Sequence, residues 1–190
     1  MNVILDLIGS AMIASLLILM MITFQYQLRD TAERTLYAMH MIDHMDQAAT
    51  KLNNVIALAG IGMPADSAVV TAGTNRMVFR SYWDWENNQL TPAPHSLEVK
   101  IVDTGTEYGK ALTIVQDGVP LSNLGYIFWI DEIRFQYYNK FDMATTTARQ
   151  VRAAEIFLTF RRNSPMGDNP SIRAKVQQKC YLMNTYMRGA

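Results

Sequence analysis

Residues 3–24 read VILDLIGSAMIASLLILMMITF, an apolar stretch of 22 residues with one charged side chain, Asp6. At about 1.5 Å of rise per residue, a helix of this length matches the roughly 30 Å hydrocarbon core of a bilayer. A carboxylate inside such a helix costs about 2.5–3.5 kcal/mol on insertion scales, so an ionisable residue there usually has a function. The stretch predicts a transmembrane helix, and Asp6 is its candidate functional residue.

The apolar stretch lacks the basic leader region and the small-residue cleavage site of a secretory signal peptide, so we expect it to be retained. Arg29 and Arg34, which follow it, are offset by Asp30 and Glu33. The positive-inside rule therefore gives no orientation for this span.

The same helix is expected to continue to Gly60, because no glycine or proline occurs between residues 25 and 59. Gly60, Gly62 and Pro64 then make continuation unfavourable. Small and apolar residues recur between these limits at alternating steps of three and four, which predicts one stripe on the helix surface. The stripe consists of Leu28, Thr31, Thr35, Ala38, Ile42, Met45, Ala49, Leu52, Ile56 and Ala59.

After the helix, the period of the apolar residues changes to two, which is typical of strands. The predicted strands are 77–82, 97–103, 110–116, 132–137, 154–161 and an edge strand at 172–182. We expect a hairpin of strands 97–103 and 110–116, connected by the segment that contains Gly105 and Gly109. We also expect a turn at Asp117-Gly118. The predicted fold class is α+β, with a long N-terminal transmembrane and amphipathic helix followed by a small antiparallel β-rich domain.

Two domains are therefore expected: the helix at residues 1–60 and a head domain at residues 61–190. The helix divides into a membrane and assembly part, 3–24, and an amphipathic extension, 25–60. The head domain has enough residues for its own core, and we expect it to fold without the helix. If it does not, a chain that starts near Thr31 should restore folding.

Composition excludes several function classes. Positive and negative side chains number 17 each, and the basic excess is confined to residues 161–190, where six Lys and Arg face Asp168 alone. This stretch has no aromatic–basic repeat, so no nucleic-acid partner is expected. Cys180 is the single cysteine, which excludes an intrachain disulfide. The sequence has no catalytic triad, nucleophile elbow or phosphate loop, so we expect no enzymatic activity, no cofactor and no small-molecule substrate.

His40 and His44 are spaced i, i+4 on the helix, which is compatible with two ligands of one metal ion. The glutamate of an HExxH motif is absent, and His95 lies in a proline-flanked segment that is expected to be a loop. We therefore interpret the histidines as solvent-facing or subunit-contact residues.

Trp83-Asp84-Trp85-Glu86 brings two aromatic rings and two carboxylates into an expected loop. The pattern is compatible with a sugar site or a glycosidase pair. However, the two carboxyl groups of a glycosidase flank the substrate, which one turn of chain arranges poorly. An edge-of-sheet role or contact with a partner protein is the favoured interpretation of this segment.

Small residues cluster early in the apolar stretch, at Gly9, Ser10, Ala11 and Ala14. Small side chains let transmembrane helices approach one another closely. The stretch therefore favours helix–helix association over a lone membrane anchor.

The order of these parts resembles type IV pilins and the pseudopilins of type II secretion. Within that group the second half is most similar to minor pseudopilin J and the related minor pilin W. The similarity lies in DGVPL at residues 117–121, which leads into IDEIRFQYY at 130–138, and in VRAAEIFLTF at 151–160. Mature pilins have Glu as the fifth residue, and Asp6 takes that position when Met1 is removed.

The resemblance implies a structural subunit of a pilus-like or pseudopilus-like filament, in which Asp6 neutralises the N-terminal amine of a neighbouring subunit. The implied partners are copies of this chain or other pilin-like subunits, and membrane lipid before assembly. The implied location is a single pass through the inner membrane with an extracytoplasmic head, then a periplasmic or extracellular filament. The candidate assembly residues are Asp6, Leu7, Gly9, Ser10, Ala14, Leu17 and Met21.

Two other functions remain open at this level. The first is a single-pass, membrane-anchored extracytoplasmic binding module that does not polymerise. The second is a membrane-tethered hydrolase that uses residues 83–86. The unpaired charge of Asp6 discriminates the filament subunit from the lone anchor, because a monomeric anchor has no need of it.

Overall fold

The computed structural model describes residues 2–106, 109–121, 128–162 and 172–187. It divides into two compact units, residues 1–43 and 44–190. Helix α1, Asn2–Ala57, begins in the first unit and ends in the second. Met1, Asp168, Arg188 and residues 107–108 of the expected hairpin connection lie outside the described residues. The predicted fold class is confirmed, because a long apolar helix precedes antiparallel sheets.

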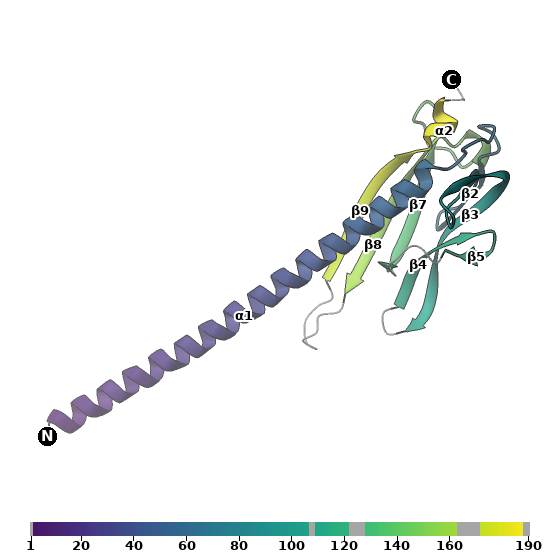
Figure 1. The fold of residues 1–190 in the computed structure, drawn as a ribbon. Helices are drawn as coiled ribbons and strands as arrows, with labels where there is room; N and C mark the ends of the chain where they lie inside the picture. The colour runs from purple at the N-terminus through teal and green to yellow at the C-terminus, as the bar shows by residue number, and fades with distance from the viewer. Residues whose placement is uncertain (1, 107–108, 122–127, 163–171, 188–190) are drawn as a thin grey trace. The chain divides into compact units, whose positions relative to one another are not determined.

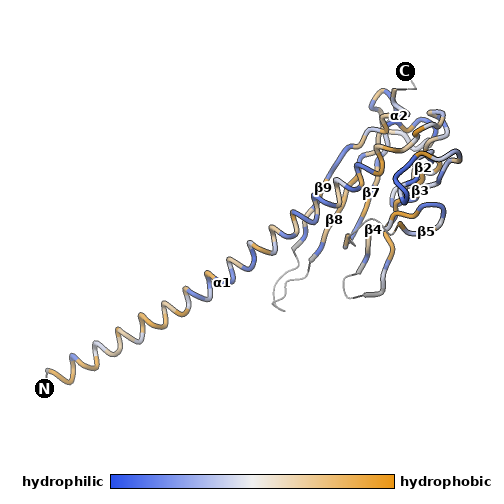
Figure 2. The backbone as a smooth tube through the Cα atoms, in the orientation of Figure 1, coloured by the Kyte–Doolittle hydropathy of each residue, from blue (hydrophilic) through white to orange (hydrophobic). Residues whose placement is uncertain are grey.

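The described residues of the first unit all belong to α1, and the side chains from Val3 to Arg29 are all exposed. Figure 2 shows apolar residues along the first half of the helix. The hydroxyl groups of Ser10, Ser15 and Thr23 donate to carbonyl oxygens of the preceding turn at 3.0, 2.9 and 2.8 Å. These polar side chains are therefore satisfied inside the helix and add little cost in an apolar environment.

The second unit contains a six-stranded and a three-stranded sheet, both antiparallel (Figure 1). The first sheet has the order β1-β2-β3-β4-β5, and β6 also pairs with β4; the second has the order β7-β8-β9. The strands of the first sheet are β1 Val69–Ala72, β2 Arg76–Asp84, β3 Gln89–Thr106, β4 Gly109–Gln116, β5 Val119–Pro120 and β6 Phe128–Trp129. Those of the second are β7 Glu132–Tyr138, β8 Ala153–Arg162 and β9 Ile172–Tyr181; η2, Ala148–Gln150, precedes β8, and α2, Met183–Tyr186, follows β9.

The predicted hairpin is present, since β3 pairs with β4 from Leu97 opposite Gln116 to Asp103 opposite Lys110. The predicted turn is also confirmed. Asp117 and Gly118 have φ of 51° and 88°, and they connect β4 to β5 as a two-residue turn. In the described part of the chain β9 pairs with β8 alone, which confirms the edge strand.

The strand around His95 was not expected. The segment belongs to β3, where His95 lies opposite Ser81. The β2–β3 register shifts between Ser81 and Trp83, so residues 91–94 oppose no paired residue of β2. Pro92 and Pro94 fall in this gap, where a missing N–H interrupts no ladder bond.

The end of α1 forms part of the core of the second unit. Ala48, Leu52 and Ile56 have no exposed surface, and neither has Ala59 just beyond the helix. The ring of His44 lies 5.3 Å from that of Phe128 in β6 and 6.1 Å from that of Phe160 in β8. The helix therefore packs against residues of both sheets.

The predicted stripe is right in part. Met45, Leu52, Ile56 and Ala59 are buried, but Ile42 is 63% exposed. The helix ends at Ala57, three residues before Gly60, because the following turn binds to the first sheet. Gly60 N–H donates to the Arg80 carbonyl at 2.9 Å, and Tyr82 N–H donates to that of Ile61 at 3.0 Å.

Replacing Gly60 by alanine is expected to destabilise the second unit strongly. Gly60 has φ of +76°, and a Cβ atom there would lie 2.6 Å from Thr185 Cγ2 and 2.9 Å from Ala68 Cβ. Left-handed strain of about 1–2 kcal/mol and overpacking of about 1–3 kcal/mol together predict a loss of about 2–5 kcal/mol, measurable by urea unfolding.

Gly118→Ala is the matched control, because φ is +88° there and no atom lies within 4 Å of the added Cβ. Its free energy of unfolding should fall only by the cost of left-handed strain, about 1–2 kcal/mol. Equal losses in the two variants would contradict the packing argument at Gly60.

Candidate functional site

The candidate assembly segment is the apolar part of α1. An 18-residue window of this helix reaches a mean hydropathy of 2.4 with none of its residues buried, and α1 is the one described helix whose length and composition would allow a membrane span. Six of the seven candidate residues lie close together on one face, because steps of three and four bring a helix back to the same side. These are Asp6, Leu7, Ser10, Ala14, Leu17 and Met21; Gly9 lies beside this face.

Asp6 is exposed and makes no hydrogen bond or ion pair with any described residue. Ser10, one turn further along, donates its hydroxyl to the Leu7 carbonyl rather than to the carboxylate. Next to Asp6, a Cβ added at Gly9 would have no atom within 4 Å. In an apolar environment the carboxylate would therefore need a cation from another molecule, and the helix surface around it is open to a close neighbour.

The histidines do not form a metal site in the described structure. The described residues contain no group of three or more His, Cys, Asp or Glu that could hold an ion. His44 is half-buried against two phenylalanine rings, so it is not a fully solvent-facing residue. His95 Nδ1 lies 2.6 Å from Asp117 Oδ2.

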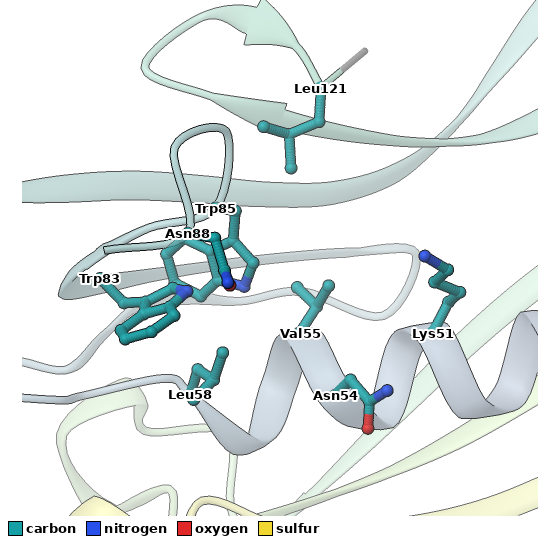
Figure 3. A pocket seen from close by; sticks show the side chains of 8 residues that line it. All are labelled: Lys51, Asn54, Val55, Leu58, Trp83, Trp85, Asn88 and Leu121. Atoms are coloured by element: carbon teal, nitrogen blue, oxygen red, sulfur yellow. The ribbon is translucent and has the colours of Figure 1, made fainter. Parts of the chain in front are cut away.

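A pocket of about 210 Å³ lies within the second unit, at the end of α1 (Figure 3). The α1 residues and the turn after β2 supply most of its wall. It is lined by Lys51, Asn54, Val55, Leu58, Trp83, Trp85, Asn88 and Leu121. The sequence drew attention to the two tryptophans but not to the helix residues, which are ordinary polar and apolar members of an amphipathic helix. Only long-range packing brings these segments together.

Asp84 holds the turn that follows β2; Trp83 lies in the strand before Asp84, and Trp85 begins the turn. It is 5% exposed and ends β2, so the loop predicted for residues 83–86 begins only at Trp85. Its Oδ1 accepts the backbone N–H groups of Glu86 and Asn87 at 2.9 and 3.3 Å and Gln116 Nε2 at 2.8 Å; Oδ2 accepts Asn87 Nδ2 at 2.7 Å. These bonds from Asn87 and Gln116 keep the pKa of Asp84 well below its ordinary value. Its carboxylate is engaged in structure, which disfavours a general-acid role.

Comparison with solved structures gives one clear fold match. A type IV-like pilin from Thermus thermophilus aligns with a TM-score of 0.53 and 11% identity, over 77% of this chain and 98% of that protein. The chain has a pilin-like fold. No protein-family model matches the sequence, and no curated protein sequence is significantly similar to it.

The pilin-like fold gives the sequence resemblance a structural basis, because the likeness appears in three dimensions at an identity too low for sequence comparison to detect. The segments that carried the resemblance form defined elements: residues 117–121 contain the two-residue β4–β5 turn and β5, and the other two segments contain β7 and most of β8. The apolar helix of this fold is long and apolar enough to cross a membrane.

In this pilin-like chain, Asp84→Asn should lower thermal stability most at neutral pH. Because the folded pKa of Asp84 is lowered, its contribution is complete above the unfolded pKa and is lost as pH falls through the folded value. The difference in Tm between the variant and the wild type should therefore shrink below about pH 4. Asp46→Asn, which changes an exposed helix carboxylate, is the control and should leave the Tm close to that of the wild type. A Tm difference that stays constant down to acid pH would contradict the role of the charge.

Proposed function

We propose that this chain is a structural subunit of a pilus-like or pseudopilus-like filament. The observation that carries the proposal is a pilin-like fold whose apolar helix is exposed from Val3 to Arg29 and holds one carboxylate without an intrachain partner in the described structure. An exposed apolar surface of this extent needs lipid or other apolar helices around it. A filament core of packed helices supplies them after the subunit leaves the membrane.

In this proposal Asp6 accepts a charge-assisted hydrogen bond from the N-terminal amine of a neighbouring subunit. Neutralisation removes most of the cost of a carboxylate in an apolar bundle, and the position of the amine sets the step between subunits. Leu7, Gly9, Ser10, Ala14, Leu17 and Met21 provide the helix contacts. The partners are copies of this chain or other pilin-like subunits.

The proposed organisation is a helix at residues 1–60 and a head at 61–190. Before assembly the helix crosses the inner membrane once and the head is extracytoplasmic; after assembly the subunit is part of a periplasmic or extracellular filament. Within the pilin group, we assign the chain to the subunits similar to minor pseudopilin J or minor pilin W. That assignment rests on the segments at 117–121, 130–138 and 151–160.

Immunogold electron microscopy of sheared surface material and of membranes, with an antibody to the second unit, tests the proposal. Label along filaments would identify a major subunit, and label at filament tips would identify a minor one. Label confined to membranes, with no filament and no higher oligomer in detergent, would reject the filament and favour a membrane-anchored binding module that does not polymerise. The pocket at the end of α1 is the observation that favours this second candidate.

A further inference from the structure

The aromatic wall of the pocket is held in place by hydrogen bonds and ring packing. The buried Asp84 carboxylate and Gln116 fix the turn, since Gln116 Oε1 also accepts the Trp85 backbone N–H at 3.1 Å. The Trp85 ring packs edge-on against Phe79 at 5.9 Å. Both indoles are half-buried, and Asn88 closes the turn with φ of 53°. The aromatic wall is therefore pre-organised, which lowers the entropic cost of binding.

The opposite wall comes from the end of α1 and from Leu58, the residue that follows the helix. Figure 3 shows Val55 and Leu58 under the two indoles, with Asn88 near them and Lys51 further along the helix. Val55 is buried and Leu58 is half-buried, so the floor is apolar. The pocket thus offers flat aromatic surface above an apolar floor, with polar groups at its margin.

Three polar side chains at the margin of the pocket have no partner among the described residues. The side chains of Lys51, Asn54 and Asn88 make no hydrogen bond or ion pair with the residues that the structure describes. An amide both donates and accepts hydrogen bonds, as a hydroxyl group does, whereas an ammonium group only donates. Among the described residues no carboxylate lines the pocket, and the one charged side chain in its lining, Lys51, is positive. The lining is matched to a ligand that is neutral or acidic and rich in hydroxyl groups.

We infer that this pocket binds one pyranose ring of a saccharide, with a sugar carboxylate favoured by Lys51. The C–H face of such a ring stacks on an indole, and its hydroxyl groups exchange hydrogen bonds with Asn54 and Asn88. The volume, about 210 Å³, suits one ring rather than an extended peptide or a lipid chain. A ligand of this kind goes beyond the filament role and departs from the sequence expectation, which favours an edge-of-sheet or partner-contact role for residues 83–86.

Titration of the full-length chain in detergent with glucuronate, glucose and N-acetylglucosamine tests the inference, followed by tryptophan fluorescence and by saturation-transfer NMR. We expect saturable binding in the millimolar range, tightest for glucuronate. Asn88→Gly keeps the left-handed backbone and removes the side-chain amide. It should lower the affinity for every sugar that binds by about tenfold. Lys51→Gln should lower the affinity for glucuronate by about tenfold and leave the affinity for the neutral sugars unchanged.

Lys175→Gln is the matched control, because it removes an exposed charge that does not line the pocket. It should bind every sugar like the wild type, and all variants should keep the wild-type melting temperature. Failure of every sugar to saturate, or binding that Asn88→Gly leaves unchanged, would overturn the inference. Loss of filaments in Asn88→Gly without any sugar binding by the wild type would also overturn it, and would make the pocket a contact between subunits. Filaments that form normally while sugar binding fails would reject the sugar site and leave the proposed filament intact.

Discussion

Replacing Asp6 by alanine is expected to abolish filament formation while leaving expression, membrane insertion and the fold of residues 44–190 unchanged. The carboxylate has no partner among the described residues, so its removal costs the isolated subunit nothing and makes its membrane segment more apolar. In the assembled state, by contrast, the neighbour's amine would lose its counter-charge in an apolar core. Filament yield from sheared cells, measured against total subunit, reports the effect.

A graded series separates charge from size at this position. Asp6→Glu should be the mildest change, and Asp6→Asn should assemble in part, because a charge-assisted hydrogen bond is about twice as strong as a neutral one. Ser15→Ala is the control for loss of a polar atom, since Ser15 bonds only to the Met12 carbonyl of its own helix in the described structure. Equal filament yields from Asp6→Ala and wild type would refute the pairing and favour the membrane-anchored binding module.

A chain that starts at Ile61 is expected to be molten or aggregated, whereas one that starts at His44 should unfold cooperatively. The four-turn end of α1 contributes Ala48, Leu52, Ile56 and then Ala59 to the core, each with no exposed surface. Removing them would leave the inner faces of both sheets uncovered. Thermal unfolding followed by near-UV circular dichroism distinguishes the two chains.

A single substitution in the full-length chain tests the same argument. Leu52→Ala should cost about 2–5 kcal/mol, the usual range for a fully buried leucine. Ile42→Ala is the matched control on the same helix; because Ile42 is 63% exposed, we expect a change within about 0.5 kcal/mol. A soluble, cooperatively folding chain that starts at Ile61 would show that the sheets hold the core without the helix, as the sequence alone had suggested.

The sequence predicts that the head domain folds without the helix, whereas the structure shows that the end of α1 is part of its core. The step of three and four residues along 28–59 identified an apolar stripe but not its partner or its phase. The stripe included Ile42, which is exposed, and missed Ala48, which is buried. Helical periodicity defines a face to within about one residue in each turn, and the packed sheets decide which of the neighbouring positions is covered.

The sequence by itself determined the long apolar helix, its lone carboxylate, the β3–β4 hairpin, the Asp117-Gly118 turn and the α+β class. Each of these depends on neighbours within a few residues: a period, a turn dipeptide, the length of an apolar run. Tertiary structure alone decided that His95 lies in a strand, that Asp84 is a buried structural carboxylate, and that Lys51, Asn54 and Asn88 border one pocket. These depend on pairings between segments far apart in the chain, and local patterns do not encode which segments meet.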